Sequence, residues 1–156
     1  MPAPDGLGTD VIAVPPASPI ELELLLESVQ EGVLVTGTAA GVARGACVRC
    51  LDGMELEFEV PVRELFVYPE REQAARESGL DSQEEPVLCG ETADLEPAVR
   101  DAIVLALPFQ PVCRETCPGL CPRCGARLED QPEHRHDDVD PRWSALQGLS
   151  TRGEES

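Results

Sequence analysis

Apolar and polar residues alternate along much of the first half of the chain. The alternation is clearest in one segment, where apolar residues (Leu56, Phe58, Val60, Val62) are separated by polar residues and a proline (Glu55, Glu57, Glu59, Pro61, Arg63). This period of two is typical of a strand with one buried face and one exposed face. Four strand-like runs lie between residues 20 and 68: ELELLLES, GVLVTGTAA, GVARGACVRC and MELEFEVPVRELFVY. Turn signals at Glu31-Gly32, Ala40-Gly41 and Asp52-Gly53 separate them, so we expect an antiparallel meander or a small, partly open barrel.

Outside this sheet the pattern changes. Residues 1–19 contain five prolines and little periodicity, which is typical of a mobile, flexible leader. Residues 69–86 are charged and poor in apolar side chains, so we expect an exposed acidic linker or a short mobile helix. Residues 87–110 predict a short strand and then a helix that starts after Asp94 and ends before Pro108. An apolar stripe would pack this helix on the sheet: Leu95, Val99, Ala102, Ile103 and Ala106.

The last third of the chain is punctuated by Cys and Pro. Residues 111–150 predict a zinc-ribbon-like segment that closes in a short helix, with Asp140 as its N-cap and Trp143 on its apolar side. Residues 151–156 form a tail. We therefore expect a single α+β domain over residues 20–150.

Charge and composition narrow the function. The chain has 30 acidic and 12 basic residues, every basic residue is Arg, and the formal net charge is -18. A phosphate-binding GxxxxGK[ST] loop and Schiff-base chemistry both need the Lys that this chain lacks. The charge opposes non-specific nucleic-acid binding and favours a basic partner. Arg outnumbers acid in residues 41–50 and 113–128, where an RNA contact is best placed.

The N-terminal residues have no basic region followed by an apolar stretch, and no segment is apolar for long enough to span a bilayer. We therefore expect a cytoplasmic protein with no membrane partner. The sequence contains no GxSxG, HExxH or GxGxxG context, and its many carboxylates single out no acid–base pair. We expect no catalytic residues, no enzymatic activity and no small-molecule substrate.

Seven cysteines in a cytoplasmic chain favour metal ligation over disulfides. Two C-x-x-C turns, a C-x3-C spacing and an H-x-H pair supply eight donors: Cys47, Cys50, Cys113, Cys117, Cys121, Cys124, His134 and His136. A C-x-x-C turn places two thiolates on one cation, and the glycine at 125 permits the left-handed backbone that such a turn adopts. The count favours two tetrahedral zinc sites. Cys89 remains, and on an apolar strand we expect it to be a small buried residue.

Two assignments of these donors stay open. In the first, one site takes Cys47, Cys50, Cys113 and Cys117, and the other takes Cys121, Cys124, His134 and His136. In the second, a single local site uses Cys113, Cys117, Cys121 and Cys124, with the first C-x-x-C free and both His solvated. Either assignment fills the zinc shell with protein ligands, which is typical of structural zinc. A thiol oxidoreductase using Cys47 and Cys50 is a less favoured alternative, because strands and glycines surround the pair instead of a strand–helix unit.

Four segments together resemble the YceD family, the large ribosomal RNA subunit accumulation proteins. They are VARGACVRCLDGMELEF, ADLEPAVRDAIVLALPFQPVC, CPGLCPRCGARL and DPRWSAL, in this order over about residues 20 to 150. The resemblance implies a non-enzymatic, metal-binding factor for accumulation or processing of large-subunit ribosomal RNA. It brings no catalytic residues.

Two modes of action follow from these expectations. In the favoured one, the protein binds precursor large-subunit ribosomal RNA through arginines near the cysteines: Arg44, Arg49, Arg114, Arg123 and Arg127. In the alternative, it is an acidic adaptor that binds a basic ribosomal protein of the large subunit without contacting RNA.

Overall fold

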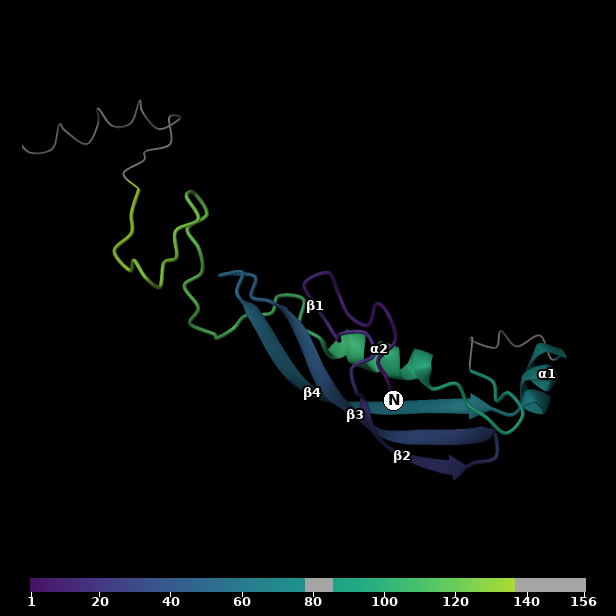
Figure 1. Cartoon of the computed structure of the whole chain (residues 1–156). Coiled ribbons are helices and arrows are strands. Elements are labelled where there is room, and N and C mark those ends of the chain that lie inside the picture. The colour runs from purple at the N-terminus through teal and green to yellow at the C-terminus, as the bar shows by residue number, and fades with distance from the viewer. Residues whose placement is uncertain (78–85, 137–156) are drawn as a thin grey trace, which may run out of the picture. The chain divides into compact units, whose positions relative to one another are not determined.

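The structure is a computed structural model that describes residues 1–77 and 86–136, and its core is a four-stranded antiparallel sheet (Figure 1). The strands are β1 (Ile12–Ala13), β2 (Glu21–Ser28), β3 (Gly32–Ala46) and β4 (Gly53–Val67). β3 is central, because β4 pairs along all of it on one side while β2 and β1 pair in succession on the other. The predicted antiparallel sheet is confirmed. Among the named strands of the described residues, β1, β2 and β4 each pair with β3 alone, so these four strands form an open sheet and not the alternative, a partly open barrel.

The turn predicted at Ala40-Gly41 is wrong, because β3 runs without interruption through both residues. Ala40 lies between Glu21 of β2 and Glu59 of β4, so its neighbours continue the ladder on both sides. Two of the four predicted runs therefore form one strand. The third run also ends early, and Cys47–Cys50 forms a turn after β3.

The faces of β4 differ as its sequence predicts. Val60 and Val62 are buried, while the intervening Pro61 and the neighbouring Glu59 are exposed. α2 (Glu96–Ala106) packs on the buried face through Val99 and Ile103. The predicted helix is confirmed and ends at the C-cap Leu107, ahead of Pro108, but its N-cap is Leu95 and not the expected Asp94. The Asp94 carboxylate instead accepts a bond from the Glu96 N–H at 3.0 Å.

The prediction of a mobile leader over residues 1–19 was wrong. Four of its apolar residues are buried in the same core as α2: Ala3, Leu7, Ile12 and Val14. The Met1 amino group donates to the Ile20 carbonyl at 2.6 Å, and the Arg100 guanidinium on α2 donates to the Asp5 and Gly6 carbonyls. Apart from the two residues of β1, the segment packs through irregular backbone, which is why its sequence shows no periodicity.

α1 (Pro69–Glu77) follows β4. It is the short helix that was one of the two structures expected for residues 69–86. The rest of the acidic linker, residues 78–85, lies outside the described residues, as do the predicted C-terminal helix with Asp140 and Trp143 and the tail 151–156. The chain divides into two compact units, Met1–Cys117 and Pro118–Ser156. Among the described residues no helix is both long and apolar enough to cross a membrane.

Replacing Leu7 by Ala tests whether the first residues belong to the core. Leu7 is 1% exposed, so Leu7→Ala should lower the free energy of unfolding by about 2–5 kcal/mol, as truncations of buried leucine do. Leu105→Ala is the matched control, because Leu105 lies on α2 but is 83% exposed and should change stability by only about 0.5 kcal/mol. Urea unfolding of both variants measures the difference. Equal, small effects would contradict the packing of this segment.

Candidate metal centres

The structure brings the eight predicted donors together in two groups of four. Cys47, Cys50, Cys113 and Cys117 form the first group, here called the four-cysteine cluster, and Cys121, Cys124, His134 and His136 form the second, the cysteine–histidine cluster. Within each group the donor atoms all lie within 4.8 Å of one another. This is the grouping of the two-site assignment. The local alternative, which joins Cys113 and Cys117 to Cys121 and Cys124, does not match it.

Each cluster is built on a C-x-x-C turn, and the two turns have the same backbone. The Leu51 N–H donates to the Cys47 carbonyl and the Gly125 N–H to the Cys121 carbonyl, each at 2.8 Å. The residue after the second cysteine has a positive φ in both, 62° at Leu51 and 72° at Gly125. Glycine adopts this conformation without steric cost, whereas leucine does not. The first turn thus keeps the same shape without the glycine.

The four-cysteine cluster joins the end of β3 to the segment that follows α2. The Val48 N–H donates to the Pro111 carbonyl at 2.9 Å, which fixes the turn against the loop that carries Cys113 and Cys117. The Arg49 guanidinium adds donated bonds to the carbonyls of Glu115 and Cys117, at 3.0 and 3.1 Å. Cys47, Cys50 and Cys117 are buried, with Met54 and Val112 packed against them. Residues 63 or more positions apart therefore meet at one point.

The cysteine–histidine cluster is local to the second unit. Cys121 Sγ lies 3.3 Å from His136 Nε2, and Cys124 Sγ lies 3.2 Å from His134 Nε2. The two Nε2 atoms are 3.0 Å apart, so both rings present the same nitrogen to one point. The Leu128 N–H donates to the Gly119 carbonyl and closes the loop after the turn.

These separations fit a tetrahedral ion. Zinc–sulfur bonds of about 2.3 Å and zinc–nitrogen bonds of about 2.0–2.1 Å imply tetrahedral edges of about 3.8 Å between sulfurs and about 3.3–3.6 Å when nitrogen takes part. In the four-cysteine cluster, Cys47 and Cys117 have their sulfurs 3.9 Å apart, and Cys50 and Cys113 have theirs 3.8 Å apart. In the cysteine–histidine cluster the donor–donor distances are a few tenths of an ångström shorter than these ideal values. The nitrogen–nitrogen distance is shorter than the sulfur–nitrogen distances, as a tetrahedral zinc site requires. Both donor sets suit zinc.

The four thiols of the four-cysteine cluster are too close together to ionise independently, and the pKa values of Cys47 and Cys50 shift in opposite directions. Backbone N–H groups, that of Cys113 foremost, stabilise the Cys47 thiolate and lower its pKa to about 6. The Asp52 N–H favours the Cys50 thiolate, but burial and the surrounding thiols outweigh it and raise the pKa of Cys50 to about 12. The Cys117 thiol and burial raise the pKa of Cys113. A divalent cation allows the thiols to ionise together, because it attracts every thiolate at once.

In the cysteine–histidine cluster one thiol is prepared for ligation. The backbone N–H groups of Arg123 and Cys124, with further hydrogen bonds from the two His rings, lower the pKa of Cys121 to about 6 despite its burial. Thiolate is the form that binds metal. The turn thus supplies a ligand that is charged at neutral pH.

The five candidate RNA-binding arginines are divided between the two units. Arg44, Arg49 and Arg114 belong to the first unit, and Arg123 and Arg127 to the second. All five are exposed. Arg44 Nε lies 2.9 Å from Glu55 Oε1 across the strand pair. Arg44 therefore has a partner within the chain, as Arg49 does in the four-cysteine cluster, and Arg114, Arg123 and Arg127 also make interactions of their own.

Two features of the clusters were missed or misjudged from sequence. Cys89 is exposed, not buried, because it lies in a tight turn closed by its bridge to Thr92. The equivalence of the two C-x-x-C turns also escaped notice, although Arg stands before the second cysteine in both, at Arg49 and Arg123. That repeat was visible in the sequence and could have revealed it.

The fold and the two clusters define a small antiparallel-sheet protein with two Cys/His groups compatible with metal binding. Residues 35–150 match the model of the large ribosomal RNA subunit accumulation protein YceD, and the chain belongs to this family. It is 44% identical over 144 residues to an uncharacterized protein of Mycobacterium tuberculosis, covering 92% of this chain and 68% of the relative. The uncharacterized protein YlbN of Bacillus subtilis is 26% identical over 141 residues, covering 89% and 78%. No solved structure matches the chain.

Proposed function

We propose that this chain is a zinc-binding, non-enzymatic factor in large ribosomal subunit biogenesis, and that it promotes accumulation or processing of large-subunit ribosomal RNA by binding the precursor RNA. The observation that carries the proposal is the pair of four-donor clusters in a chain of the YceD family. Each zinc ion would have four protein ligands and no open position for a substrate, so it would organise the backbone and not catalyse.

The RNA contact is assigned to the exposed arginines beside the clusters. Arg114 lies between Cys113 and Cys117, Arg123 lies inside the second C-x-x-C turn, and Arg127 lies three residues after Cys124. A guanidinium group matches the geometry of a phosphate, and a metal-bound turn holds its backbone in a fixed position. In a chain of net charge -18, binding of this kind has to be local to such points.

Serine replacements test this assignment. A triple variant with Arg114→Ser, Arg123→Ser and Arg127→Ser should crosslink to precursor RNA much more weakly, and its binding should depend less on salt, by a log–log slope of about 1 for each phosphate that is no longer bound. The matched control removes three arginines distant from both C-x-x-C turns in sequence, Arg63→Ser, Arg71→Ser and Arg152→Ser, and keeps Arg100, which bonds to the N-terminal segment. Unchanged crosslinking of the first variant, or an equal loss in both, would contradict the assignment.

A second candidate function is an acidic adaptor that binds a basic ribosomal protein. The bond from Arg44 to Glu55 and the bonds from Arg49 to backbone carbonyls favour it, because these two candidate cations already have partners within the chain. Nuclease treatment separates the candidates: a complex held by RNA falls apart, whereas a complex held by protein contacts persists. A thiol oxidoreductase would differ from both in having reactive Cys47 and Cys50 thiols in place of zinc.

A further inference from the structure

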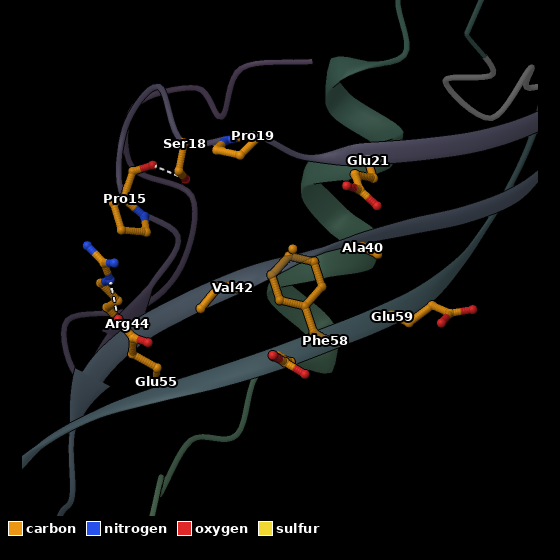
Figure 2. A pocket seen from close by; sticks show the side chains of 12 residues that line it. Pro15, Ser18, Pro19, Glu21, Ala40, Val42, Arg44, Glu55, Phe58 and Glu59 are labelled. Carbon is orange, nitrogen blue, oxygen red and sulfur yellow. Dashed lines mark hydrogen bonds and ion pairs between the residues drawn. The ribbon is translucent and has the colours of Figure 1, made fainter.

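A groove on the first unit combines an apolar lining with a row of carboxylates. It measures about 660 Å³ and is formed by β2, β3, β4 and the loop before β2 (Figure 2). Phe58, Val42 and two prolines of the loop, Pro15 and Pro19, give it apolar surface. The Ser18 hydroxyl donates to the Pro15 carbonyl at 2.6 Å and holds the loop in shape.

The groove lies where the sheet is incomplete. β2 pairs with β3 up to Ala40 and β1 pairs with it from Arg44, so between these residues β3 has β4 as its only strand partner in the described chain. At the edge of this gap the ring of Phe58 lies against Gly41, where a Cβ would come within 2.9 Å of the ring. Glycine at this position therefore lets the ring occupy the space.

The carboxylates follow the strand period. Glu55, Glu57 and Glu59 stand at alternate positions of β4, so they share one face at intervals of about 6.7 Å. Glu21 extends the row sideways, because it and Glu59 both pair with Ala40. Among residues 1–77 and 86–136, neither Glu21 nor Glu57 nor Glu59 has an ion-pair partner.

Glu55 forms an ion pair with Arg44, so a guanidinium group can bind to the carboxylates of this groove. Both side chains are exposed, at 65% for Arg44 and 63% for Glu55, so the ion pair is weak and open to competition. An incoming guanidinium can take the place of Arg44 at Glu55 while its neighbours bind the remaining carboxylates.

We propose that this groove binds an extended segment of a basic partner protein, with arginine or lysine at alternate positions. An extended chain presents alternate side chains on one face with the same interval of about 6.7 Å as the glutamates of β4, so charge and spacing match together. The inference rests on the second candidate function, the adaptor for a basic protein, and assigns the surface that would carry it.

Peptide binding to the zinc-loaded full chain tests the proposal. The probe is a fluorescently labelled synthetic peptide in which arginine and threonine alternate, and its control has the same composition with the arginines in one block. Glu57→Gln with Glu59→Gln should weaken binding of the alternating peptide about tenfold, which is about 1.4 kcal/mol. The matched variant, Glu23→Gln with Glu27→Gln, removes two exposed charges of β2 outside the groove and should stay within about twofold of the unmodified protein.

Three outcomes would overturn the proposal. Equal weakening in both double variants would mean that binding depends only on the net charge of the protein. Equal affinity for the two peptides would mean that the alternate spacing of the arginines does not contribute to binding. Loss of RNA crosslinking in the groove variant, with peptide binding unchanged, would make RNA the ligand of this surface. Failure of the adaptor function is a separate result: no basic protein would then persist with the chain after nuclease treatment.

Discussion

Replacing Cys47 and Cys50 together by Ser should lower the zinc content from about two ions per chain to about one and destabilise the first unit. These residues supply half of the four-cysteine cluster, and the segment carrying Cys113 and Cys117 would lose its attachment to the end of β3. Structural zinc in small peptides binds with an apparent free energy of about 10–16 kcal/mol. A loss of half of this, about 5–8 kcal/mol, is comparable with the whole stability of a typical domain, about 5–15 kcal/mol.

Zinc measurement by mass spectrometry and hydrogen exchange over residues 40–60 and 111–117 check this expectation. The exposed Cys89 gives the control, because Cys89→Ser removes a thiol that belongs to neither cluster and should change neither quantity. If zinc content is unchanged in the Cys47→Ser, Cys50→Ser variant, the four-cysteine cluster does not hold metal. The single local site of Cys113, Cys117, Cys121 and Cys124 would then return as the better assignment.

Removing zinc from the cysteine–histidine cluster should unfold residues 118–136 and leave the sheet intact. In this stretch Cys121 is the one buried hydrophobic residue, so the segment has no apolar core of its own. The first unit, by contrast, keeps the core around Leu7, Val60 and Ile103. Small domains without a core depend on metal for their fold, and chelators unfold them.

The test replaces Cys121 and Cys124 by Ser and follows amide exchange. The Gly125 and Leu128 amides, which donate to carbonyls within the segment, should exchange rapidly in the variant, while amides of β3 and β4 remain protected. Glu133→Gln, next to a ligand but outside the cluster, should leave both regions unchanged. Full protection of residues 118–136 in the absence of zinc would show that another interaction holds them.

These two experiments also show how far along the chain the loss of each cluster has an effect. The four-cysteine cluster joins residues far apart in sequence, so its loss should spread to β3 and the loop after α2. The cysteine–histidine cluster closes a loop of 16 residues, from Cys121 to His136, and its loss should stay local. The stabilisation expected from a metal cross-link grows with the length of the loop that it closes. The four-cysteine cluster is therefore expected to stabilise its unit more than the cysteine–histidine cluster stabilises its own.

Local patterns were sufficient for the regular elements and for the ligand types. The alternation in β4 predicted its buried and exposed faces, and the apolar stripe predicted α2, because both depend on short periods along the chain. The spacing of the cysteines predicted the C-x-x-C turns. The donor count then favoured two sites, since an H-x-H pair matched two unpaired thiolates.

Other features depended on contacts between distant residues. The residues before β2 show no hydrophobic periodicity. Leu7 and Ile12 are nevertheless buried, because they pack in the same core as α2. The glycine at 41 suggested a turn, whereas it serves to admit the Phe58 ring. Neither outcome follows from neighbouring residues, because the deciding contacts come from elements far away in the chain.

The sequence by itself determined that this is an acidic protein of strands and one core helix with eight metal donors, since composition and short-range spacing carry that information. Only the tertiary structure decided which donors meet. Cys117 stands midway between Cys113 and Cys121 in the sequence, so spacing allows it to join either group. The hydrogen bond from Val48 to Pro111 places the first C-x-x-C turn against the Cys113–Cys117 loop, and that contact assigns Cys117 to the four-cysteine cluster.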